Sequence, residues 1–169
     1  MHVFHKLDEV PHDFGPTFVS VGNFDGVHRA HRHVLREIVE RAKAYSTTGT
    51  SAKSVAVTFE PHPIRILRPD SGLKLLTPTP EKIRLLAETG LDAVLMLPFT
   101  RDLSLMTPRQ FAHDILHKSL RACEVHEGFN FHFGHKASGN VDTLKEFGSQ
   151  MGFQVVMYAE MKLRGESVS

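Results

Sequence analysis

Histidines gather where an apolar segment of the sequence gives way to a helical pattern. Residues 22–35 read GNFDGVHRAHRHVL and include His28, His31 and His33. His28 and His31 are three apart, so at the start of a helix they lie on one face, where the first-turn N–H groups can receive an anion. This spacing favours a phosphate-handling role for the pair. A metal site is the weaker alternative, because His33 points off their shared face and no acidic or cysteine residue stands at zinc-finger spacing.

The glycines beside these histidines do not form a common dinucleotide or P-loop signature. Gly22 and Gly26 permit tight backbone geometry and close approach to a ligand. However, the segment contains neither GxGxxG nor GxxxxGK[ST]. A Rossmann dehydrogenase and a P-loop kinase are therefore both disfavoured.

A second candidate loop, EPHPIRILRP, covers residues 60–69. Prolines on both sides of His62 stiffen the backbone. Arg65 and Arg68 offer forked donors suited to a phosphate or a carboxylate. The loop could therefore contribute to an anionic ligand site.

A third candidate loop, EGFNFHFGHKASGN, covers residues 127–140. Phe129, Phe131 and Phe133 alternate there with polar residues. So many aromatic side chains could bury a flat ring system, with Asn130 forming hydrogen bonds to its edge. Any one of these phenylalanines could equally be an ordinary core residue.

The elements that must position these loops alternate along the chain. Short runs predict strands at residues 17–22, 54–59, 92–99, 122–128 and 153–158. All but 122–128 are rich in β-branched or aliphatic residues without clean alternation, which predicts burial on both faces. Helical spacing predicts helices at residues 31–46, 79–90, 107–120 and 140–152. The order predicts an α/β domain with a central parallel sheet of about five strands. In such sheets ligands bind beyond the carboxyl ends of the strands.

Local signals mark several helix boundaries. Thr79 is the expected N-cap of the second helix, with Pro80 in its first turn and Gly90 as its stop. Thr107 and the following proline repeat this opening in the third helix. In the first helix, Glu37 and Arg41 have the spacing of an i,i+4 ion pair.

Composition restricts the class of protein. The chain has 169 residues, 41% hydrophobic and 23% charged, which is typical of one globular domain over residues 1–169. The formal net charge of +1 gives no electrostatic footprint for nucleic acid. The chain has a single cysteine, Cys123, and no apolar run at its N-terminus, which predicts a cytoplasmic protein. Its longest apolar run is AVLML, which is too short for a membrane span. The sequence does not indicate an oligomeric state.

Taken together, the three loops resemble one family. GNFDGVHRAH resembles the GxFDGxHxGH motif of nucleotidyltransferases, and FEPHP with EGFNFHFGHKASGN narrows the resemblance to the bacterial FAD synthetases. In that family the adenylyltransferase domain is usually the N-terminal half of a bifunctional riboflavin kinase/FAD synthetase. The resemblance runs from about Phe18 to Ser169 and implies a Rossmann-like nucleotidyltransferase domain.

The resemblance also implies a reaction and its site. ATP and FMN would be the substrates and FAD the product, with Mg²⁺ bridging phosphate oxygens and no protein metal ligand assigned. His28 and His31 would be the catalytic residues. The ATP side would comprise Gly22, Phe24, Asp25, His28, His31 and Ser169. The flavin side would comprise Pro61, His62, Pro63, Leu67, Phe111, Asn130 and Phe133.

Two departures from the family pattern lead to further expectations. Ala30 stands where the family usually has glycine, and the small methyl group predicts an adjusted phosphate pocket. The last residues, RGESVS, resemble the start of a Ser-Ser-Thr/Ser-x-x-Arg motif, with Ser169 as its first serine. We therefore expect a chain truncated at its C-terminus, without the riboflavin kinase domain.

Two other functions remain open at this point. One is a sibling adenylyltransferase that acts on another phosphorylated acceptor. The other is a catalytically incomplete module that binds flavin or nucleotide. An enzyme acting on nucleic acid is disfavoured by the near-neutral charge.

Overall fold

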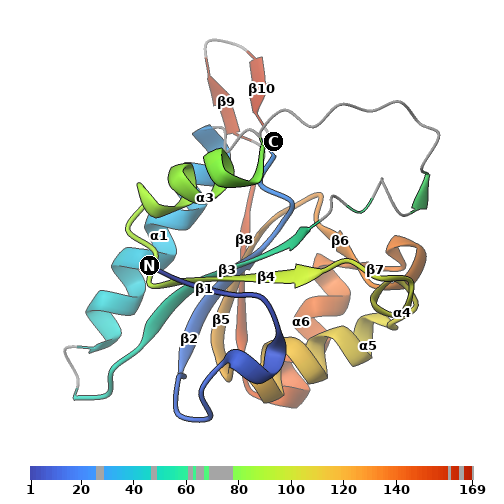
Figure 1. Ribbon diagram of the computed structural model, residues 1–169, viewed down its shortest axis with the longest axis horizontal. Coiled ribbons are helices and arrows are strands. Elements are labelled where there is room, and N and C mark those ends of the chain that lie inside the picture. The colour runs from blue at the N-terminus through green and yellow to red at the C-terminus, as the bar shows by residue number, and fades with distance from the viewer. Residues whose placement is uncertain are drawn as a thin grey trace.

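A six-stranded parallel sheet forms the centre of the computed structural model, in the order β1-β4-β3-β2-β5-β8 (Figure 1). The structure describes residues 1–25, 29–46, 49–60, 63, 67, 68 and 78–159, together with the backbone of 161–163 and 166–168. The strands are β1 (His2–Phe4), β2 (Thr17–Val21), β3 (Lys53–Glu60), β4 (Ala93–Pro98), β5 (Ala122–Gly128) and β8 (Gln154–Tyr158). The α/β class and the five predicted strands are confirmed. The edge strand β1 was not predicted.

Helices cover both faces of this sheet (Figure 1). One face packs against α1 (Arg29–Ser46) and α3 (Thr79–Ala87), through a core that includes Phe18, Leu35 and Val94. The other face packs against α5 (Pro108–Phe111), the π-helical segment Ala112–Ser119 and α6 (Val141–Met151). Alternate residues of the buried strands therefore enter opposite cores, as the period of two in a strand requires.

Short elements complete the described chain. Two 3₁₀ turns occupy Leu7–Glu9 (η1) and His135–Ala137 (η3), and α4 spans Arg101–Ser104. Two antiparallel ribbons pair β6 (His132–Phe133) with β7 (Gly139–Asn140), and β9 (Met161–Leu163) with β10 (Glu166–Val168).

The helix starts test the boundary predictions. The Thr107 side chain accepts a hydrogen bond from the Gln110 backbone N–H and closes a capping box, which confirms the predicted start. Thr79 is not an N-cap. Its hydroxyl instead donates to Glu60 Oε2 at 2.6 Å, and Pro78 occupies the cap position of α3. Because α3 already begins at Thr79, this residue lies one position past the cap.

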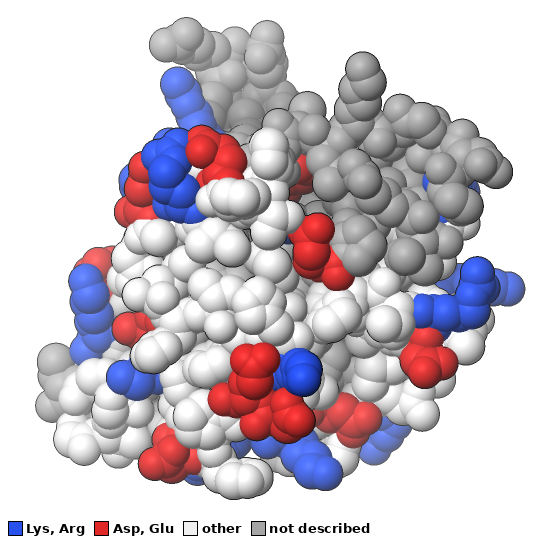
Figure 2. Space-filling view, viewed as in Figure 1, with Lys and Arg blue, Asp and Glu red and all other residues white. Residues whose placement is uncertain are grey.

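The visible surface carries mixed charge. Lys and Arg side chains are interspersed with Asp and Glu among wide uncharged areas (Figure 2). Among the residues that the structure describes, no helix is both long and apolar enough to pass through a bilayer.

Candidate functional site

A pocket of about 200 Å³ lies at the carboxyl ends of three neighbouring strands, β2, β5 and β8. The lining residues come from these strand ends and from the first turns of α1. They are residues 20–22, 24, 30, 31, 34, 127–131, 158 and 159. Gly22, Phe24, His31 and Asn130, all sequence-predicted site residues, line this one pocket.

The turn after β2 brings Phe24 against His31. Phe24 has a left-handed backbone (φ 51°), which is uncommon for a residue with a side chain. Its ring is buried and meets the His31 ring edge to face, with centroids 5.3 Å apart. A Cβ on Gly22 would lie 3.3 Å from the same ring. The turn therefore fixes the His31 ring at the start of α1.

The loop after β5 forms the facing wall. The Phe129 backbone N–H donates to the Tyr158 carbonyl oxygen at 2.9 Å, and the Phe131 N–H donates to the Gly128 carbonyl oxygen at 3.1 Å. These bonds hold the segment at the end of the sheet. Phe129 is 47% exposed and lines the pocket beside Asn130, so an aromatic face and an amide border the same space.

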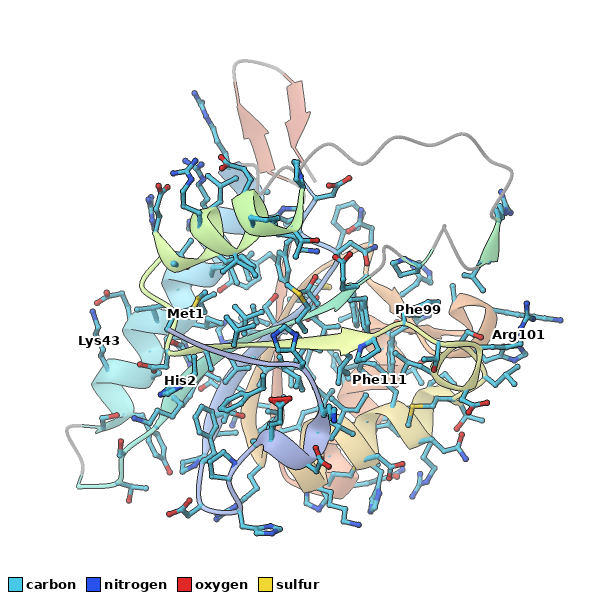
Figure 3. All side chains as sticks on the ribbon, viewed as in Figure 1. Met1, His2, Lys43, Phe99, Arg101 and Phe111 are labelled. Atoms are coloured by element: carbon cyan, nitrogen blue, oxygen red, sulfur yellow. The ribbon has the colours of Figure 1, made fainter. Side chains whose placement is uncertain are left out.

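Other predicted flavin-side residues lie away from this pocket. Phe133 and Phe111 are buried in the same hydrophobic core, with ring centroids 5.9 Å apart. Figure 3 labels Phe111. Leu67 is 60% exposed, and Pro63 is half-buried. None of these four lines the described pocket, and their assignment to the flavin side stays a prediction.

Several predicted residues lie outside the described part of the chain. They are His28, Pro61, His62 and Ser169. Asp25 is described and is half-buried in the turn after β2.

Glu127 places a carboxyl group in the pocket wall, which the sequence analysis missed. The residue is only 4% exposed, and its Oε1 accepts a hydrogen bond from the Val21 backbone N–H at 2.5 Å. Burial raises the pKa of this carboxyl group well above its ordinary value, although the Val21 hydrogen bond acts the other way. The signal in the sequence was a charged residue at the end of a buried strand.

A chain of hydrogen bonds runs from α1 to the pocket. Arg41 forms two bonds to Glu124, Nε to Oε1 at 2.7 Å and Nη2 to Oε2 at 2.8 Å. Glu124 Oε1 lies 2.8 Å from His126 Nε2, and His126 Nδ1 lies 2.8 Å from the Tyr158 hydroxyl. Tyr158 lines the pocket. These four residues were not recognised as a group from the sequence.

The protonation states of the residues in this hydrogen-bond chain follow from their surroundings. Burial alone would raise the pKa of Glu124, but hydrogen bonds from Arg41 and His126 hold it below its usual range. Burial lowers the pKa of His126, which therefore favours the neutral ring. A carboxylate only accepts, so Nε2 donates to Glu124 and Nδ1 accepts from Tyr158. Burial also raises the pKa of Tyr158 to about 12, which keeps its proton in place.

Lys82 brings a buried positive charge close to the same end of the sheet. It lies on α3, is 6% exposed, and interacts electrostatically with Glu60 and Asp25. Burial lowers the pKa of its ammonium group, and the two carboxylates oppose this effect. Within the described ranges, no cluster of three or more histidine, cysteine, aspartate or glutamate residues could hold a metal ion.

Comparison with protein-family models gives a match to FAD synthetase over residues 10–169. Among curated proteins, the bifunctional riboflavin kinase/FMN adenylyltransferase of Escherichia coli K12 is 33% identical over 151 residues, which cover 89% of this chain and 46% of that protein. The protein of the same description from Pseudomonas fluorescens is 33% identical over 150 residues, with the same coverage. The chain thus spans about half the length of the curated relatives it matches.

Two solved structures share the fold. A structure described as a macrolide-efflux protein from Streptococcus pneumoniae aligns with a TM-score of 0.79 at 21% identity, covering 99% of this chain and 52% of that one. A pantoate-beta-alanine ligase from Francisella tularensis aligns with a TM-score of 0.62 at 10% identity, covering 100% and 71%. At these identities the likeness concerns the fold alone.

Proposed function

Because the chain belongs to the FAD synthetase family, we propose that it transfers the adenylyl group of ATP to FMN, giving FAD and pyrophosphate. The observation that carries the proposal is the family match over residues 10–169. The pocket supports it, since Gly22, Phe24, His31 and Asn130 come together there from loops far apart in the sequence. The cytoplasmic location expected from the single cysteine is part of the same proposal.

The chemistry needs positioning more than proton transfer. The phosphate of FMN is already an anionic nucleophile, so the site must hold it in line with the α-phosphorus of ATP and stabilise charge on the phosphate oxygens. His31 lies in the first turn of α1 and lines the pocket, so its ring and the helix N-terminus can stabilise negative charge that develops there. Lys82 adds a positive charge near Asp25.

The turn after β2 offers one carboxylate, Asp25, for a magnesium ion. Mg²⁺ in nucleotide sites usually takes one or two carboxylates and completes its coordination with phosphate oxygens and water. Asp25, in the turn after β2, is the residue we assign to hold it, directly or through water. When bound, the ion would neutralise charge on the phosphates.

The test is adenylyl transfer by histidine variants. We expect His28→Ala and His31→Ala each to reduce FAD formation by about 10²-fold or more, the usual cost of removing one transition-state donor. His113→Ala is the control, because His113 is exposed on the segment Ala112–Ser119 and pairs with Asp114. Near-normal turnover in both histidine variants would refute the catalytic assignment.

The assay should follow FAD and pyrophosphate from FMN and ATP, for this chain and for the product of its complete gene side by side. Pyrophosphate release with a different phosphorylated acceptor in place of FMN would favour a sibling transferase. Binding of flavin or nucleotide without pyrophosphate release by either protein would favour the binding module.

A further inference from the structure

Tyr158 stands at the pocket wall on the same side of the sheet as α1. It ends β8, pairs with Gly128 of β5, and is half-buried. Its ring meets the ring of His33, on α1, edge to face with centroids 5.8 Å apart. His31, two residues earlier on α1, lines the same pocket as Tyr158. The pocket therefore brings together the aromatic ring of Tyr158, from β8, and His31, from α1.

The hydrogen-bond chain behind Tyr158 restricts how its ring can move. His126 is fully buried and holds the Tyr158 hydroxyl, while Glu124 holds His126. Arg41 closes the chain with two bonds to Glu124, and its side chain is 44% exposed. The chain thus reaches from the outside of α1 to the pocket wall.

Such an arrangement has an energetic cost that calls for a reason. Burying a histidine and a carboxylate is expensive unless every polar group finds a partner. Here the partners exist, and a fully satisfied network fixes side-chain positions. A ring that is already fixed loses little rotamer freedom when a ligand packs on it.

We propose that Tyr158 is a binding residue for the adenosine part of ATP, and that Arg41, Glu124 and His126 position its ring. The inference rests on the proposed function. With the triphosphate at His31, the nucleoside would extend toward Tyr158, which lines the same pocket and contacts α1 through His33. The opposite side contains Phe131, which stacks on the buried Phe133 at 5.4 Å.

The experiment compares Michaelis constants in the product of the complete gene. Tyr158→Ala removes the ring, and we expect the KM for ATP to rise about tenfold or more, as on loss of a base-stacking aromatic. Tyr158→Phe keeps the ring but removes its hydrogen bond to His126. Arg41→Met removes the two hydrogen bonds to Glu124 at the other end of the hydrogen-bond chain. For each of these we expect an increase of about threefold, the effect of one net hydrogen bond. The KM for FMN should stay within about twofold in all three, because the change is confined to the α1 side.

Matched controls separate positioning from general damage. Lys43→Met removes a cation from the outer side of the same helix (Figure 3), where Lys43 is exposed and pairs with Glu40 at 3.7 Å, and it should leave both constants unchanged. The double variant Arg41→Met/Tyr158→Phe should match either single variant, since both changes interrupt one chain. Melting temperatures and circular dichroism identify any variant that fails to fold, and Tyr158→Phe and Arg41→Met then carry the test.

The outcomes distinguish the two levels of proposal. If the unaltered protein forms no FAD, the proposed function fails. If it forms FAD but the KM for ATP does not change in the Tyr158 variants, the inference alone is refuted. Equal increases for ATP and FMN, or a loss of stability without a change in either constant, would assign Tyr158 and its chain a purely structural role and also refute it.

Discussion

The buried carboxyl group of Glu127 makes the stability of this protein depend on pH in a specific direction. Glu127 is 4% exposed, and burial raises its pKa in the folded state well above the ordinary value. The stability that this group contributes is complete below the unfolded pKa of about 4.3. It is lost as pH rises through the folded pKa, because the unfolded chain releases the proton first.

Glu127→Gln measures this effect. Glutamine has the same size, and its carbonyl oxygen can accept the Val21 N–H bond that Glu127 accepts now. The variant cannot ionise at this position. The free energy of unfolding of the variant minus that of the original protein should therefore increase by about 1.4 kcal/mol for each pH unit, from about pH 5 up to the folded pKa of Glu127.

Urea denaturation followed by circular dichroism at about one-unit intervals from pH 5 to pH 8 gives the difference. The other titrating groups, including the twelve histidines, cancel between the two proteins. Glu146→Gln, on the exposed side of α6, controls for the loss of one formal negative charge. Parallel pH curves for Glu127→Gln and the original protein would refute the reasoning.

Two further predictions concern backbone geometry and capping. Gly134→Ala should lower the free energy of unfolding by about 2 kcal/mol or more, because φ is +80° and the new Cβ would lie 2.6 Å from Pro108 Cγ. Gly152→Ala is the control for backbone strain, because φ is +91° and a new Cβ would have nothing within 4 Å. It should lower the free energy of unfolding by about 1 kcal/mol in chemical denaturation. Equal losses in the two variants would contradict a steric clash at Gly134. Thr107→Ala should cost about 1 kcal/mol by removing the capping box with Gln110, and an unchanged melting temperature would show that the cap is not stabilising.

The strands were predictable where burial alone decides them. Four of the five predicted strands are mainly apolar runs that can be seen without knowledge of their neighbours, and the fifth, ACEVHEG at residues 122–128, is a shorter and more polar signal. β1 has three residues, and its strand geometry depends on pairing with β4, where His2 meets Ala93 and Phe4 meets Leu95. No local pattern carries that information, so the sixth strand could not be predicted.

The candidate site was predictable in its loops but less so in its contacts. Helical spacing predicted a Glu37–Arg41 pair, whereas the fold brings Arg41 to Glu124, 83 residues away. Glu124 and His126 share a strand face and were open to pairing from sequence alone. Their link to Tyr158, however, depends on the β5–β8 register. Similarly, the alternation of phenylalanines could not show that Phe133 enters the core while Phe129 lines the pocket.

The position of β2 in the middle of the sheet has a consequence for synthesis of the chain. β2 pairs with β3 on one side, but its other neighbour, β5, begins roughly a hundred residues later. At ribosomal rates of about 5–20 residues per second, that edge waits about 5–20 s for its partner. During this time the nascent chain exposes the unpaired N–H and C=O groups along the edge of β2 that later pairs with β5. An exposed strand edge is a template for pairing with a wrong strand. Chaperone supply during expression should therefore increase the yield of folded protein, since it protects one edge of β2 until residues 122–128 emerge.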